Sequence, residues 1–138
     1  MTPEQKTTLA RRLIACGLPV PTFTSLIPTR GIWVPGHRGY DHATRIMWQV
    51  VATDTGPELL PVLTDFALLG WVIAEVERLI GGPIDMYSSP ADDYDEDGGN
   101  YDEVYRGGTV LKIGTGRSRI KALTVAWEAA LEAAKVAG

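Results

Sequence analysis

The stretch TDFALLGWVIAEVERLIGGP, residues 64–83, predicts the central helix of the fold. Thr64 is a favourable N-cap, and the glycine pair before Pro83 ends the helix after Ile80. Apolar side chains lie on nearly every face of the first three turns, so the helix needs cover on all sides. A layered fold or a second subunit would give that cover, and a homo-oligomer is therefore one of two expected arrangements.

Two further helices are predicted, one near each end of the chain. The first, residues 3–15, has Thr2 as its N-cap and Gln5 placed to complete a capping box. The last, residues 119–136, follows Ser118 as N-cap and carries apolar side chains with the helical period.

Three segments between the helices are predicted as strands, because apolar and β-branched residues alternate in them: residues 45–52, 84–87 and 109–113. A short strand is also expected at residues 31–34. The three longer strands would pair as one sheet. The predicted fold class is therefore α+β, with a small antiparallel sheet packed with three helices in a layered sandwich.

Length and composition predict a single domain over residues 1–138. The chain has 138 residues and is 45% hydrophobic, which suits one core. Within this domain, residues 18–42 are rich in proline and glycine and are expected to be irregular. Residues 89–103 are expected to form a mobile acidic loop.

Cysteine use and hydropathy predict a cytoplasmic protein. The single cysteine, Cys16, can form neither an intrachain disulfide nor a cysteine metal cage, which favours a reducing compartment. The N-terminus does not resemble a secretory signal. The most apolar stretch, residues 66–80, is shorter than the ~20 residues of a spanning helix and contains charged side chains. We therefore expect no membrane role.

Acidic residues are concentrated in one part of the chain. The formal net charge is −4, yet residues 92–103 alone contain seven acidic residues and no Lys or Arg. The rest of the chain is therefore mildly basic, a pattern that bears on partners more than on fold. We expect no direct binding of nucleic acid.

The clearest signal for a ligand is the turn between the last predicted strand and the last helix. Two glycines would let the backbone approach a ligand, and N–H groups at a helix start favour anions. The candidate phosphate-binding residues are Gly114, Thr115, Gly116, Arg117, Ser118, Arg119 and Lys121. The alternative is an ordinary β-to-α turn with a serine cap and solvated basic side chains.

A second set of ligand contacts is predicted in the segment 18–42. Trp33 precedes Arg38 and Tyr40, and a flat ring near arginines can hold a base or a ribose. His37 and His42 belong to the same loop, but their spacing lacks the helical pattern of a zinc motif. The alternative is that these polar loop residues are simply solvated.

Residues 93–98, DYDEDG, match the first half of a calcium-binding loop. Val104 stands at the twelfth position, where such loops place a bidentate Glu. Asp93, Asp95 and Asp97 are candidate calcium ligands, with a solvated loop or a nucleic-acid-like acidic surface as alternatives. The sequence predicts no metal and no cofactor otherwise.

Three segments give the chain a resemblance to a known group: LTDFALLG at residues 63–70, GRSRIKAL at 116–123 and AWEAAL at 126–131. Together they resemble small bacteriophage accessory proteins of the phage ABA-sandwich group, over about residues 60–135. The resemblance implies a phage or prophage accessory protein with an α/β sandwich, acting in an infected bacterial host. The group supplies no catalytic residues to carry over.

The resemblance leads to a counter-defence function. The first hypothesis is a non-enzymatic binder that sequesters a small nucleotide immune signal. The second is a protein–protein inhibitor of a host defence complex, which would use the acidic loop as a nucleic-acid mimic or the apolar central helix. An enzyme such as a nucleotide hydrolase ranks third, because the sequence lacks a recognisable carboxylate, metal or nucleophile constellation.

Overall fold

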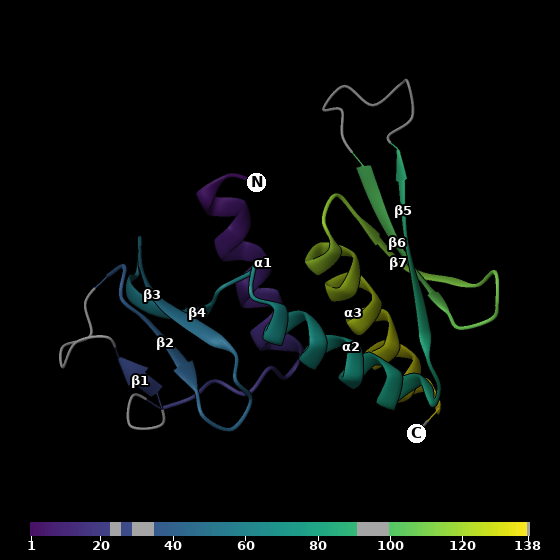
Figure 1. The fold of residues 1–138 in the computed structure, drawn as a ribbon, viewed down its shortest axis with the longest axis horizontal. Helices are drawn as coiled ribbons and strands as arrows, with labels where there is room; N and C mark the ends of the chain where they lie inside the picture. The colour runs from purple at the N-terminus through teal and green to yellow at the C-terminus, as the bar shows by residue number, and fades with distance from the viewer. Residues whose placement is uncertain (23–25, 29–34, 91–99, 138) are drawn as a thin grey trace. The chain divides into compact units, whose positions relative to one another are not determined.

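The computed structural model describes residues 1–22, 26–28, 35–90 and 100–137. The chain forms two compact units, an N-terminal unit, Met1–Gly70, and a C-terminal unit, Trp71–Gly138 (Figure 1). Helix α2, Phe66–Ile80, crosses the boundary between them. The single domain expected over residues 1–138 stays a prediction.

The N-terminal unit consists of helix α1, Pro3–Cys16, and a four-stranded antiparallel sheet. The strands lie in chain order: β1, Leu26–Pro28, β2, Arg38–Asp41, β3, Met47–Thr53, and β4, Gly56–Pro61. The irregular segment expected over residues 18–42 is therefore wrong in part, because β1 and β2 lie within it. The predicted strand at residues 31–34 lies outside the described residues.

Helix α1 begins and ends as predicted. The Gln5 N–H donates to Thr2 Oγ1 over 3.1 Å, and the Thr2 N–H donates to Gln5 Oε1 over 2.8 Å, which completes the capping box. Gly17 ends the helix with φ +121°, and its N–H bonds to the carbonyl of Ile14. Both ends of this helix are thus determined by local sequence.

Strand β3 carries much of the core of the N-terminal unit. Trp48 and Val50 are buried while Gln49 and Val51 between them are half-buried, as their alternation predicts. Strand β4, which pairs with β3 across the Thr53–Gly56 turn, was not predicted. Its prolines, at both ends of the pairing, are typical of turns and edge strands.

Helix α2 begins one residue after the predicted start. Asp65 Oδ1 accepts the Ala67 N–H over 3.2 Å, so Asp65 is the N-cap and the prediction of Thr64 is wrong. Gly81 ends the helix with φ +76°, as expected. Phe66 is 84% exposed, so this chain alone does not cover the helix on all faces. A homo-oligomer stays a prediction.

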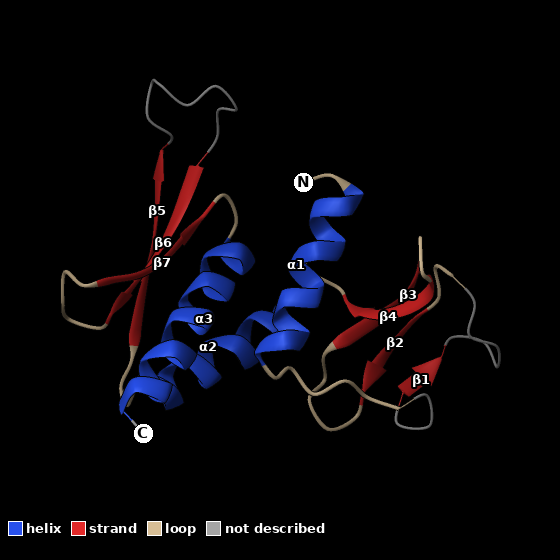
Figure 2. Ribbon diagram, turned by 180° about the vertical axis from the view of Figure 1, so that it is seen from behind, coloured by secondary structure: helices blue, strands red, loops and turns tan. Residues whose placement is uncertain are grey.

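The C-terminal unit packs a three-stranded antiparallel sheet against helix α3 (Figure 2). Its elements are β5, Ile84–Pro90, β6, Asn100–Arg106, β7, Lys112–Gly116, and α3, Arg119–Ala137, with the strands in chain order. The α+β class is confirmed. The prediction of a single sheet is wrong, because β3 and the C-terminal strands belong to separate sheets.

The strand predicted at residues 109–113 is misplaced. Residues 107–111 turn the chain between β6 and β7, and Val110 at this turn is 96% exposed. Strand β6 was missed because its sequence, NYDEVYR, is mostly polar. It occupies the end of the acidic loop expected over residues 89–103, of which residues 91–99 are not described.

Helix α3 begins at its predicted cap, since Ser118 Oγ accepts the Lys121 N–H over 3.2 Å. Leu123 and Trp127 are buried along its apolar stripe. The Trp127 ring meets Trp71 of α2 edge-on, with centroids 5.5 Å apart. None of the helices, as far as they are described, combines the length and the apolar character needed to cross a membrane.

Candidate ligand-binding groove

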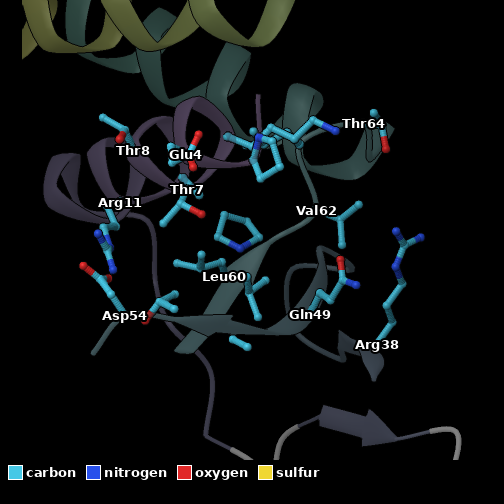
Figure 3. Close-up of a pocket in the computed structure, with 18 residues that line it drawn as sticks. Glu4, Thr7, Thr8, Arg11, Arg38, Gln49, Asp54, Leu60, Val62 and Thr64 are labelled. Carbon is cyan, nitrogen blue, oxygen red and sulfur yellow. The ribbon is translucent and has the colours of Figure 1, made fainter. Parts of the chain in front are cut away.

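A groove of about 710 Å³ lies between helix α1 and the β3–β4 hairpin of the N-terminal unit (Figure 3). Pockets for small organic ligands have volumes of roughly 300–1,000 Å³, so this groove has a suitable size. Helix α1 lines it with Pro3, Glu4, Lys6, Thr7, Thr8, Ala10 and Arg11. The sheet and the segments next to it add Arg38, Gln49, Val51, Ala52, Thr53, Asp54, Leu60, Pro61, Val62, Leu63 and Thr64.

One row of side chains crosses the sheet side of this groove. Arg38 of β2 is paired with Gln49 of β3, and Gln49 is paired with Leu60 of β4, so the three share one face of the sheet. Leu60 is buried, Gln49 is half-buried and Arg38 is exposed. The row therefore passes from an apolar floor through an amide to a cation at the rim.

Arg38 is the cation of this row that remains available to a ligand. Its side chain has no hydrogen-bond or ion-pair partner among the residues that the structure describes. A guanidinium presents several N–H donors in a planar fork that matches phosphate and carboxylate oxygens. An anion at the rim of the groove would therefore find a charged donor beside the Gln49 amide.

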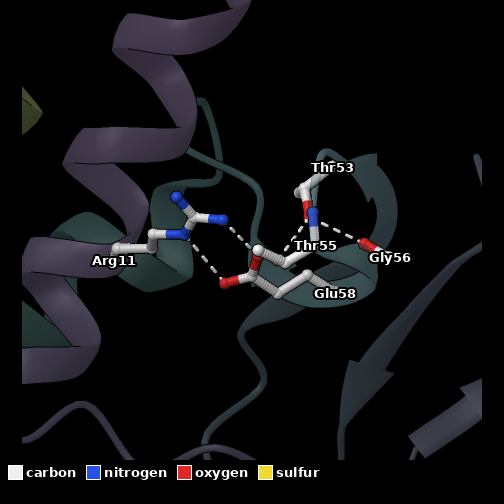
Figure 4. A network of polar contacts seen from close by, with 5 residues as sticks. All are labelled: Arg11, Thr53, Thr55, Gly56 and Glu58. Carbon is white, nitrogen blue, oxygen red and sulfur yellow. Dashed lines mark hydrogen bonds and ion pairs between the residues drawn. The ribbon is translucent and has the colours of Figure 1, made fainter.

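Arg11, at the other end of the groove, is already paired (Figure 4). Its Nε and Nη2 donate to Glu58 Oε1 and Oε2 over 3.0 and 2.6 Å. The hydrogen bond from Arg11 lowers the pKa of Glu58 below its usual range. At the same turn, the Thr53 hydroxyl donates to the carbonyl of Gly56 over 2.7 Å. This network joins α1 to the β3–β4 hairpin and makes Arg11 a structural residue.

The predicted phosphate-binding turn, residues 114–121, differs from the groove because its two glycines pack against a helix. Gly114 and Gly116 are buried against α3, and a Cβ on Gly114 would lie 2.8 Å from the Cβ of Ala126. A Cβ on Gly116 would lie 2.9 Å from the backbone N of Ala122. Both glycines therefore allow α3 to pack closely on β7. Their Cβ sides are filled by the protein's own helix.

The remaining groups of the turn are in part engaged. The Lys121 N–H donates to Ser118 Oγ, and the Ala122 N–H donates to the carbonyl of Ser118 over 2.9 Å. The Arg117 guanidinium lies over the Tyr101 ring, 4.4 Å from its centroid. Thr115, Arg119 and Lys121 are exposed. A ligand at this turn stays a prediction.

The second predicted set is only partly brought together. Arg38 and Tyr40 both lie on β2, and the Tyr40 ring contacts the His42 ring edge-on with centroids 5.7 Å apart. Of these residues only Arg38 lines the groove. Trp33 lies outside the described residues. This set belongs to the N-terminal unit and the glycine turn to the C-terminal unit, so no common site is defined.

The structure describes only one of the two candidate metal sites, the loop that holds His37 and His42. Asp41 is buried and accepts the Ala43 N–H over 3.2 Å and the Thr44 hydroxyl over 3.0 Å, so its carboxylate stabilises the turn after β2. In the described part of the chain, no three His, Cys, Asp or Glu side chains come together as metal ligands. Asp93, Asp95 and Asp97 lie outside that part.

Most residues of the groove were not anticipated from the sequence. Thr7 and Gln49, for example, are ordinary polar residues of a helix and a strand, and no motif surrounds them. Both line the groove because α1 packs on β4, the partner strand of β3, which brings together segments about 40 residues apart in the sequence. Of the described lining residues, only Arg38 belonged to a predicted ligand set.

Compared with known proteins, the chain matches no family model, no curated protein and no solved structure. The resemblance to phage ABA-sandwich proteins therefore stays a prediction, and function has to be inferred from the geometry of the site.

Proposed function

We propose that this chain is a non-enzymatic binder of a small nucleotide and that the groove between α1 and the β3–β4 hairpin is its ligand site. The observation that carries the proposal is the row of Leu60, Gln49 and Arg38, which places an apolar floor, an amide and an unpaired cation side by side. A nucleotide has the matching parts in the same sequence: a flat base, a hydrogen-bonding edge and a phosphate.

Each part of the ligand has a suitable contact. The base would lie on the floor formed by Val51, Leu60 and Val62. Threonine hydroxyls of α1, on Thr7 and Thr8, are within the same lining and can bind ribose hydroxyls. Arg38 would bind the phosphate, because Arg11 is held by Glu58.

The charge of the lining limits the ligand. Three basic residues, Lys6, Arg11 and Arg38, are accompanied by the acidic residues Glu4 and Asp54. A triphosphate would meet repulsion from these carboxylates that a single phosphate or a cyclic dinucleotide would largely avoid. We therefore expect selectivity for nucleotides of low negative charge, a class that includes cyclic dinucleotide signals.

Binding without turnover is part of the proposal. Among the described residues, the groove lining contains threonines but no serine, histidine or cysteine that could serve as an activated nucleophile or a near-neutral base. The ligand should accordingly be recovered unchanged. Sequestration of an immune nucleotide in an infected bacterium is the biological role that fits such a binder and the phage resemblance.

The test is native mass spectrometry of the full chain with a mixture of cyclic dinucleotides, mononucleotides and ADP-ribose derivatives, followed by calorimetric titration of any adduct. Arg38→Ala should weaken binding by at least about tenfold, since a charge-assisted hydrogen bond contributes roughly 1.5–3 kcal/mol. Arg119→Ala is the matched control, because it removes an exposed arginine of the predicted glycine turn. Equal loss in both variants, or loss only in Arg119→Ala, would refute the groove as the site.

A further inference from the structure

Strand β5 lies at an edge of the C-terminal sheet. The sheet order is β5–β6–β7, so β6 occupies one side of β5 and no described strand pairs with the other side. An edge strand presents a row of N–H and C=O groups that can pair with another extended chain. The register of β5 with β6 determines which of these groups point outward.

The hydrogen bonds at the start of β5 establish how its ladder with β6 alternates. The Gly107 N–H donates to the carbonyl of Pro83 over 2.8 Å. The next pair, Ile84 with Arg106, is therefore a non-hydrogen-bonded one. The Arg106 N–H accordingly donates away from β5, to the carbonyl of Leu111 over 3.1 Å. Ile84 and every second residue after it therefore direct their N–H and C=O groups away from β6.

Two of the outward N–H groups remain open to a partner. Those of Met86 and Ser88 have no hydrogen-bond acceptor among the residues that the structure describes. The Ile84 N–H, in contrast, donates to Glu77 Oε2 over 3.1 Å. Pro90, the last residue of the strand, has no N–H. The open donors thus lie one residue to either side of the middle of β5.

The open groups of β5 are self-complementary about Tyr87, the middle residue of the strand. When two copies lie antiparallel with Tyr87 opposite Tyr87, Met86 of each copy lies opposite Ser88 of the other, and these residues can exchange both hydrogen bonds. Ile84 and Pro90, which have no N–H to offer, then lie opposite each other. A register shifted by two residues in either direction places an open residue opposite one of them and leaves its carbonyl without a donor.

The same register gives the exposed ring of Tyr87 a partner. Tyr87 is 56% exposed and meets Tyr105 of β6 edge-on, with centroids 5.5 Å apart. Opposite Cα atoms of a non-hydrogen-bonded pair are about 4.5 Å apart, so the Tyr87 side chains of two copies would be in contact. Asp85 lies opposite Ser89 of the other copy, so no like charges face each other.

We propose that β5 is the interface of a symmetric homodimer, in which the edge strands of two copies pair antiparallel about Tyr87. A twofold contact uses the same surface on both copies and closes after two. A second copy is the occupant that the strand favours, because its open N–H groups and its non-donating residues lie at matching positions. The interface belongs to the C-terminal unit and does not depend on the nucleotide groove.

Sedimentation velocity of the full chain over a range of concentrations tests the dimer. Ser88→Pro removes an outward N–H and keeps the ladder with β6, since an edge strand tolerates proline where the N–H faces away from its partner. Because each copy loses a hydrogen bond, the dissociation constant of the dimer should rise at least about tenfold. Ser88→Ala is the matched control, because it keeps the N–H and likewise removes the hydroxyl that donates to Asp102. It should dimerise as wild type does.

Disulfide cross-linking tests the register. In a Cys16→Ala background, Tyr87→Cys should form a covalent dimer with oxidised glutathione, because opposite Cα atoms lie within the roughly 4.4–6.8 Å that a disulfide spans. Asp85→Cys in the same background is the control on the same face of the strand. In this register its two copies are four residues apart, roughly 13 Å, so it should not cross-link.

Three results would overturn the proposal. A wild type that stays monomeric at every concentration would leave β5 to a partner other than a second copy. A dimer that Ser88→Pro does not weaken, with circular dichroism showing a folded variant, would place the contact elsewhere, for example at the exposed Phe66. Equal cross-linking of Tyr87→Cys and Asp85→Cys would reject the pairing about Tyr87.

Discussion

The two units differ in how closely a helix packs on the antiparallel sheet. Each places a helix on an antiparallel sheet, but α1 leaves a groove of about 710 Å³ beside β3, whereas α3 lies close against β7. The close contact is possible because Gly114 and Gly116 have no Cβ and face Ala122 and Ala126. At the N-terminal contact the ion pair of Arg11 with Glu58 joins helix to hairpin. Side-chain size where helix meets sheet thus decides whether space for a ligand remains.

The largest expected effect comes from disturbing the close contact. Gly114→Ala introduces a Cβ 2.8 Å from the Ala126 backbone N, which the helix can relieve only by moving away from the sheet. We expect the free energy of unfolding to fall by about 3 kcal/mol, the upper end of overpacking effects. Urea denaturation followed by tryptophan fluorescence measures the change, because Trp127 of α3 is buried.

Gly70→Ala is the matched control for that measurement. Gly70 lies inside helix α2, and a Cβ at this position would meet nothing within 4 Å. Alanine should therefore raise stability by roughly 0.5–1 kcal/mol through helix propensity. Similar behaviour of the two variants would mean that the contact between α3 and β7 is not as close as described.

The next largest effect compares the two helix caps. Asp65 accepts the Ala67 N–H and also the Met47 N–H of β3 over 2.7 Å, so it links α2 to the N-terminal sheet. The Ser118 hydroxyl accepts only the Lys121 N–H among the described contacts. We expect Asp65→Ala to lower the unfolding free energy by about 2 kcal/mol and Ser118→Ala by about 1 kcal/mol. The reverse order in thermal denaturation would contradict a tertiary role for Asp65.

Filling the groove with a large side chain should remove the space in the N-terminal unit where the ligand is proposed to bind. Thr7 is half-buried in the groove lining, and Thr7→Trp would occupy the space proposed for the base. We expect nucleotide affinity to fall about tenfold or more while the fold is kept. Ala15→Trp, an exposed position of the same helix outside the lining, should leave affinity unchanged in calorimetric titration. Undiminished binding by Thr7→Trp would place the ligand elsewhere.

The smallest expected effect is the pH dependence of the ion pair between Arg11 and Glu58. The pKa of Glu58 is lowered in the folded state, so the pair stabilises the fold above the unfolded pKa of about 4.3. That contribution disappears as the pH falls through the lowered folded value. Glu58→Gln should therefore melt slightly below wild type at pH 7, with the difference closing in strong acid. A difference that grows on acidification would contradict the assignment.

Local signals predicted part of this fold well. The capping box at Thr2 and Gln5, the cap at Ser118 and the alternation around Trp48 all depend on neighbouring residues, and all are confirmed. The division into two sheets depends on which strands pair, and neither composition nor periodicity specifies pairing between distant segments. Strands β6 and β4 were not predicted, because β6 is mostly polar and β4 contains two prolines.

The candidate site shows the same limit. The glycines at 114 and 116 suggested a ligand-binding turn, but in the structure their missing side chains make room for α3. A Gly-x-Gly pattern by itself does not distinguish a ligand-binding turn from close packing of a helix. The groove is lined by residues of three elements, such as Thr7, Gln49 and Leu60, so no short sequence motif predicts it. Arg38 was found because an arginine near aromatic residues is suggestive by itself.

The most direct test of the central claim is a set of ¹H–¹⁵N correlation spectra of the full chain recorded during titration with a cyclic dinucleotide. The account predicts that shift changes concentrate on the groove, at α1 residues 3–11, β3 residues 49–53 and Arg38. The glycine turn at residues 114–121 should remain unchanged. Changes concentrated on that turn, or none for any nucleotide in the panel, would contradict the claim that the open helix–sheet contact is the ligand site.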